Sequence, residues 1–143
     1  MALNFGDGCK GAGGYVPMAQ SNVHPIVGTP FFQIEVVQAP SQAPAILCWG
    51  LSDKMWANTI PLPLDLRTLG MPGCTLYVDP YFVWGTATVG GSPGNGKGII
   101  PFPIPAVGSF IGLELFFQWA IYDTSQSRSI PLTWSDGLRV IIG

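Results

Sequence analysis

Apolar and polar side chains alternate in residues 31–38, where Phe32, Ile34 and Val36 are separated by polar side chains. A period of two places one face of a β-strand against a core. The run at 113–122 is rich in aromatic residues and also favours a strand over a helix. Further apolar runs that predict strands lie at residues 45–51, 74–78, 82–89, 99–104, 130–134 and 138–142. The pattern therefore predicts a nearly all-β chain of about eight short strands.

Turn residues separate these runs, because the 19 glycines and 14 prolines are spread between the apolar segments rather than gathered in one tract. Many short strands divided by turns are typical of a two-sheet antiparallel sandwich, either jelly-roll or immunoglobulin-like, and the strand order stays open. Asp136 and Gly137 lie between the last two runs and predict a tight hairpin turn. Residues 52–58, with Ser52 as N-cap, and residues 65–69 are expected to form short helical turns that act as connectors.

The N-terminal segment differs from the rest of the chain. Glycine alternates with small or polar residues over positions 6–14, and such a segment has too little apolar surface to bury itself. We therefore expect an extended N-terminal arm over residues 1–28 and one β-sandwich domain over residues 29–143, within the usual size of a single domain. The arm residues that we expect to contact a neighbouring subunit are Phe5, Tyr15, Val16, Met18, Val23 and Ile26.

Charge is scarce. The chain has 48% hydrophobic and 10% charged residues and a net charge of -2, against roughly 25% charged residues in an average domain. No basic run is present, which argues against nucleic-acid binding because that needs clustered cations. Every apolar stretch is interrupted well before the roughly 18 apolar residues of a spanning helix. The first residues lack the basic and apolar regions of a signal peptide, and whether a leader has been removed stays open.

Candidate catalytic groups are few. The single histidine, His24, precedes Pro25 within the arm and has no second histidine to complete a metal site or a catalytic triad. The glycine run 6–14 lacks the Gly-Lys-Ser/Thr ending of a phosphate-binding loop. The aspartates stand beside turn residues, where they cap backbone N–H groups, and they show no calcium-loop spacing. We therefore predict a protein that is not an enzyme and that uses no cofactor and no metal ion.

The three cysteines have different surroundings. Cys48 lies in an apolar run, where a free thiol behaves as a small core residue. Cys9 and Cys74 both stand beside glycine in turn-like segments, which makes them the plausible disulfide pair in an oxidising compartment. Closing a loop of about 65 residues would add about 4 kcal/mol of stability in the chain-entropy account. The alternative is three reduced thiols in a cytosolic protein.

The five tryptophans allow a second functional interpretation. Trp49 and Trp119 lie inside apolar runs and are expected in the core, whereas Trp56 and Trp84 are expected to be more exposed. If Trp56, Trp84 and Tyr81 share one exposed face, they would form an aromatic platform on which sugar rings stack.

Several segments follow one recognisable pattern. Residues 6–14 read GDGCKGAGG, and residues 61–78 contain PLPLDL followed by LGMPGCTLYV. Residues 117–120 read FQWA, and the chain ends at 135–143 with SDGLRVIIG. With these motifs, which span nearly the whole chain, it resembles a poorly characterised module of secreted bacterial proteins that often stands at their C-terminus. The resemblance implies secretion, a β-sandwich and pairing of Cys9 with Cys74, and Cys48 is not part of the pattern.

These observations predict a binding or structural role. The principal hypothesis is an extracellular or cell-surface structural protein, a self-assembling subunit of a filament or surface layer whose N-terminal arm contacts the open sheet edge of a neighbouring copy. A head-to-tail contact of this kind does not close and so propagates as an open helical assembly. The alternative is a carbohydrate-binding or adhesion module of a secreted protein, with a polysaccharide as its partner.

Overall fold

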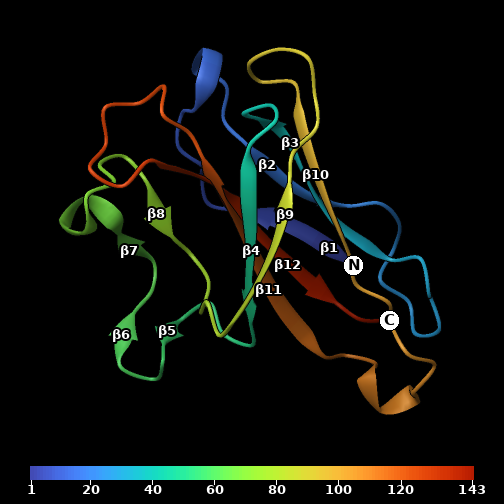
Figure 1. Ribbon diagram of the computed structural model, residues 1–143. Helices are drawn as coiled ribbons and strands as arrows, with labels where there is room; N and C mark the ends of the chain where they lie inside the picture. Colours follow the sequence, from blue (N-terminus) through green and yellow to red (C-terminus); the bar gives the residue numbers. More distant parts are fainter.

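The computed structural model describes residues 1–143 as two antiparallel β-sheets packed face to face (Figure 1). The larger sheet has five strands in the order β1-β12-β11-β4-β9, and the smaller has three in the order β10-β3-β2. The prediction of an all-β antiparallel sandwich is confirmed. The strands are β1 (Ala2–Phe5), β2 (Met18–Ser21), β3 (Gln33–Ala39), β4 (Pro44–Gly50), β9 (Phe82–Ala87), β10 (Gly96–Pro101), β11 (Glu114–Tyr122) and β12 (Leu132–Ile141).

Small elements complete the fold, and no helix in it has the length and hydrophobicity of a membrane span. The helical turn expected at 65–69 is present, and the Asp65 carboxylate accepts a 2.9 Å hydrogen bond from Arg67 N at its start. The helical turn expected at 52–58 is absent, because Ser52 caps only the turn that leads into the β5–β6 hairpin. These elements are β5 (Met55–Trp56), β6 (Ile60–Pro61), β7 (Leu64–Asp65), β8 (Thr75–Leu76) and the 3-10 helices η1 (Ala12–Gly14), η2 (Leu66–Leu69) and η3 (Gly108–Phe110).

Hydrophobic clusters cover both faces of the five-stranded sheet. On β11, Phe117 and Trp119 join an inner cluster of 17 buried residues that packs between the two sheets. Phe116 and Ala120 join an outer cluster of 10 buried residues, which packs against the layer containing β7 and β8. The buried Gln118 side chain hydrogen-bonds to the backbone of that layer. Because β11 is covered on both faces, its sequence is a nearly continuous apolar run rather than an alternation.

Strand β12 runs without interruption through Asp136 and Gly137, so the predicted hairpin turn is wrong. A Cβ atom added at Gly137 would lie 2.5 Å from the ring of Phe5, so this glycine allows the ring to pack on the strand. Asp136 is 8% exposed, and its carboxylate binds the backbone of β2. An Asp-Gly pair favours a turn by local preference alone. Here long-range contacts with both N-terminal strands override that preference.

The N-terminal 28 residues do not form an arm apart from the sandwich, and this expectation is corrected. β1 pairs with β12 in the larger sheet, and β2 pairs with β3 in the smaller one. The glycine-rich stretch between β1 and β2 is fastened at Cys9, whose N–H donates a 2.9 Å hydrogen bond to Trp134 O. Ala19 on β2 is buried in the inner cluster. The segment has little apolar surface of its own, but strands from the rest of the chain supply its partners.

Candidate functional site

The predicted disulfide is present. Cys9 and Cys74 are bonded, with their Cα atoms 5.0 Å apart, and the bridge joins the glycine-rich stretch to the outer layer of the larger sheet. Cys48 is a free buried thiol in the outer cluster, as the apolar run predicts. Burial raises the pKa of the Cys48 thiol to about 12, so it stays protonated and unreactive at neutral pH.

Three of the six predicted subunit-contact residues pack against other parts of the molecule, although one of the three stays exposed. Phe5 packs edge to face against Tyr77 and Phe116, with ring centroids 5.9 and 6.3 Å apart. The ring of Tyr15 lies directly on Gly94 in the loop between β9 and β10. Val16 is half-buried. The residues from this set that remain exposed are Tyr15, Met18, Val23 and Ile26.

The predicted sugar-stacking residues do not share one face. Trp84 on β9 packs against Trp49 and Phe102 on the inner side of the larger sheet, with ring centroids 5.3 and 5.5 Å apart. Trp56 packs against the outer cluster on the opposite side of that sheet. Tyr81 lies just before β9 and is 73% exposed. The sheet itself separates Trp56 from Trp84, so the three rings cannot form a single platform.

The free margin of β9 is an apolar sheet edge. β9 is hydrogen-bonded to β4 on one side and ends the order of the five-stranded sheet. Phe82, Val83 and Trp84 are all exposed, with Val83 at 53%. The segment 81–89 contains neither a charged residue nor a proline. Sheet edges are normally protected by charge, proline, bulges or a covering segment. This edge carries no such charge or proline, so the sequence leaves it open to pairing.

An apolar hollow adjoins this edge. β9 and β10 meet only near Val89 and Lys97, which exchange two backbone hydrogen bonds of 3.0 and 2.9 Å. Farther along, a hollow of about 330 Å³ lies beside the inner cluster, and its lining is entirely hydrophobic. Trp49 stacks on Phe82 at 4.3 Å in its wall. The side of the sandwich between β9 and β10 is therefore incompletely closed.

The opposite margin of the larger sheet is β1. Met1 and Ile141 exchange two backbone hydrogen bonds of 2.7 Å, which form a hydrogen-bonded pair at the end of this ladder. In an antiparallel ladder the next residue, Ala2, directs its backbone N–H and C=O away from β12. Leu3 is 45% exposed. The sheet therefore ends in a second free edge, which lies in the N-terminal segment.

A buried carboxylate joins the two sheets beside β1. Asp136 Oδ1 accepts a 2.9 Å hydrogen bond from Ala19 N on β2, and Asp136 Oδ2 accepts a 2.9 Å bond from Asn4 Nδ2 on β1. Asn4 Nδ2 also donates to Ala19 O at 2.7 Å. Burial raises the pKa of Asp136, although these hydrogen bonds oppose the shift. Sequence reasoning missed this residue because an Asp-Gly pair is typical of turns.

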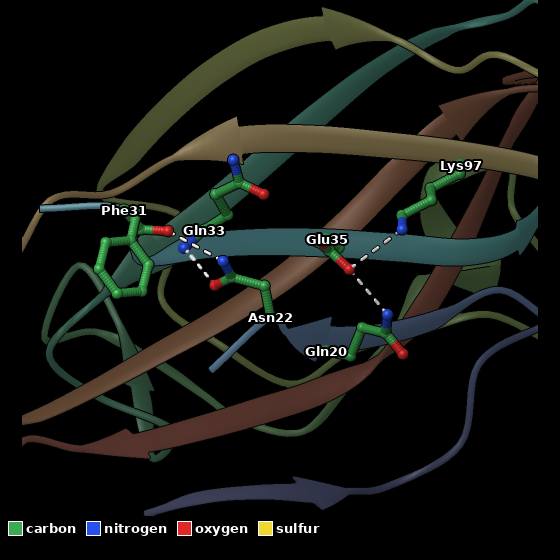
Figure 2. Close-up of polar contacts among 6 residues, drawn as sticks. All are labelled: Gln20, Asn22, Phe31, Gln33, Glu35 and Lys97. Atoms are coloured by element: carbon green, nitrogen blue, oxygen red, sulfur yellow. Dashed lines mark hydrogen bonds and ion pairs between the residues drawn. The ribbon is translucent and has the colours of Figure 1, made fainter. Parts of the chain in front are cut away.

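The outer face of the smaller sheet carries a polar network (Figure 2). Gln20 Nε2 on β2 donates a 2.8 Å hydrogen bond to Glu35 Oε1 on β3, and Lys97 Nζ lies 3.5 Å from the same oxygen. Asn22 Nδ2 donates a 2.9 Å hydrogen bond to Phe31 O, and Asn22 Oδ1 accepts a 2.7 Å hydrogen bond from Gln33 N. These groups bind one another across neighbouring strands, so the network stabilises strand pairing.

Catalytic or metal chemistry gains no support from the arrangement. His24 is exposed in the loop after β2. No group of three or more His, Cys, Asp or Glu side chains is placed to hold a metal ion. The buried Asp123 carboxylate accepts hydrogen bonds from Ser125 N and Thr133 Oγ1, at 2.9 and 3.1 Å. Both carboxylate oxygens are therefore already hydrogen-bonded within the protein.

No protein-family model matches the chain, and no curated protein sequence is significantly similar to it. The resemblance to a module of secreted bacterial proteins therefore stays a prediction. The functional conclusion therefore depends on the sheet edges and their side chains.

Proposed function

We propose that this chain is an extracellular structural domain that assembles with copies of itself, by joining β9 of one copy to β1 of the next. The observation that carries the proposal is the exposed, uncharged edge of β9, in which Phe82, Val83 and Trp84 stand beside unpaired backbone groups. An exposed apolar edge strand is a template for pairing with another strand. Pairing would cover these side chains and satisfy the backbone at once.

The arrangement of the larger sheet favours an open chain of copies. Its four strand pairings are all antiparallel, so β1 and β9, at opposite margins, run in the same direction. A repeat of the sheet therefore places β9 beside β1 of the next copy as a parallel pair. Such a head-to-tail contact does not close on itself and propagates as a fibre. The twist of β-sheets would turn the fibre into a helix.

The surface composition supports the same function. Only 10% of residues are charged, so little repulsion opposes contact between copies. Large apolar side chains next to the β9 edge, among them Leu51 and Tyr81, are strongly exposed. Contiguous exposed apolar surface usually marks an interaction site. A neighbouring copy would cover it.

The disulfide supports an extracellular location. Cys9 and Cys74 lie 65 residues apart in sequence, and bridges of this kind persist mainly in oxidising compartments. In the chain-entropy account, a bridge that closes a loop of this length adds about 4 kcal/mol of stability.

The test is a complementation experiment. We expect the full chain to form filaments in negative-stain microscopy and to scatter light strongly. Val83→Lys on β9 and Leu3→Lys on β1 should each give monomers, because a charge on an edge strand opposes pairing. An equimolar mixture of the two variants should form dimers and stop there, since each variant keeps one intact edge.

The matched control is Ile130→Lys, which places the same charge at an exposed apolar position in the loop between β11 and β12. It should polymerise like the original chain. A monodisperse monomer from the unmodified chain would refute self-assembly. Dimers that survive Leu3→Lys but not Val83→Lys would instead mean that β9 pairs with β9, and would overturn the head-to-tail arrangement.

A further inference from the structure

A polar cleft lies at the end of the sandwich where the β3–β4, β9–β10 and β11–β12 connections come together (Figure 1). It has a volume of about 610 Å³ and is lined by residues from the segments 40–44, 90–93 and 122–125, with Ala12 from the N-terminal segment. The cleft lies away from the apolar hollow beside β9, with which it shares no residue. It therefore offers a second surface with different chemistry.

The walls of the cleft are held in place by hydrogen bonds between its loops. Thr88 Oγ1 donates to Pro40 O at 2.6 Å, and Gln42 Nε2 donates to Gly90 O at 2.9 Å. Ser41 Oγ also donates to Ser92 O. A site whose walls are already fixed loses less conformational entropy when a ligand binds. The cleft is thus preformed.

Most residues that line the cleft are small or polar, and none of its exposed side chains is charged. The hydroxyls of Ser92, Tyr122 and Thr124 have no side-chain hydrogen bond within the protein, and they line the cleft together with backbone groups of its glycine-containing loop. The one carboxylate, Asp123, is 5% exposed and bound by Ser125 and Thr133. Neutral donors and acceptors suit a ligand that carries hydroxyl groups and no charge.

Tyr122 gives this polar cleft an aromatic wall. It is the last residue of β11 and is 46% exposed. A neighbouring apolar hollow of about 300 Å³ also has Tyr122 in its lining, along with Pro44, Ile46, Ala120 and Leu132. The ring therefore stands between a polar and an apolar surface. A sugar ring has a matching division, with C–H groups on its faces and hydroxyls around its rim.

We infer that this cleft binds a neutral saccharide, with the apolar face of one sugar ring stacked on Tyr122 and its hydroxyls hydrogen-bonded to the loops. The inference is independent of assembly through β9. It places the saccharide away from Trp56, Tyr81 and Trp84, the residues from which the sequence predicts sugar stacking.

The test is affinity electrophoresis in native gels that contain dextran, laminarin or galactomannan as neutral polysaccharides, with alginate as an acidic one. All variants are tested in the Val83→Lys background, so that assembly does not alter their migration. Saccharide binding can then be measured whether or not the assembly proposal is correct. We expect retardation by at least one neutral polysaccharide and none by alginate. Tyr122→Ala should weaken the association about tenfold, whereas Tyr122→Phe should keep most of it.

The matched control is Tyr81→Ala, which removes an equally large and more exposed tyrosine outside the cleft. It should bind like its parent, and thermal unfolding should show that Tyr122→Ala is folded. Absence of retardation by all three neutral polysaccharides would overturn the inference. Equal retardation of Tyr122→Ala and Tyr81→Ala would also overturn it, because sieving or another site would then explain the effect.

Discussion

The two sides of the sandwich are closed by different means. On the side of β1 and β2, the Asp136 carboxylate and the Asn4 amide satisfy backbone groups of β2 and join the sheets. On the side of β9 and β10, the strands meet only near Val89 and Lys97, and exposed aromatic side chains occupy the edge. Polar side chains that bind an edge backbone remove its capacity to pair with another chain. Side chains therefore occupy the backbone of the β2 edge and join it to the larger sheet, whereas the outer margin of β1 and the side of β9 stay available for pairing.

The largest expected effect comes from removing the carboxylate on the closed side. Asp136→Leu leaves the Ala19 N–H and one Asn4 amide donor without their acceptor. Because an unsatisfied buried donor costs about 1–3 kcal/mol, the free energy of unfolding should fall by about 3 kcal/mol. Urea denaturation measures this loss in the free energy of unfolding. Asp53→Ala, which removes a carboxylate that makes no hydrogen bond or ion pair, is the control, and an equal loss in both variants would refute this role.

The second prediction concerns pH. Burial raises the pKa of Asp136 in the folded state above its ordinary value of 3.8. In the window between the two values the folded state binds more protons than the unfolded state, so this residue's contribution to stability falls as pH rises. The contribution is complete below 3.8 and is lost as pH passes the raised folded pKa. The difference in unfolding free energy between the original chain and Asp136→Asn should therefore decrease over that window. A difference that is flat or increases with pH would contradict the assignment.

The smallest expected effect on stability is on the open side. Val83→Lys changes an exposed side chain on an edge strand, so the free energy of unfolding should change by less than about 0.5 kcal/mol. The same substitution should abolish assembly, which separates the surface's role from the fold. Chemical denaturation at a concentration too low for assembly gives the value. A loss near that of Asp136→Leu would mean that β9 is needed for folding rather than for contact between copies.

Several features of this protein were predictable from sequence because they depend on neighbours in the chain. The alternation at 31–38 predicted β3, and the aromatic run at 113–122 predicted β11. The surroundings of the cysteines indicated both the Cys9–Cys74 bridge and the buried thiol at Cys48. In each case the side-chain pattern within about ten residues carries the information, since strand period and burial are local properties.

Other features depended on residues far apart in the chain. Local patterning was enough to predict an all-β sandwich and most of its long strands, and the surroundings of the cysteines favoured the disulfide. The three-dimensional structure was needed to show that Asp136 lies within β12, that residues 1–28 complete both sheets, and that Trp56 and Trp84 face opposite sides. The physical reason is that edges, faces and clefts are created by pairing between distant strands. A local sequence pattern does not specify which strand will be the neighbour.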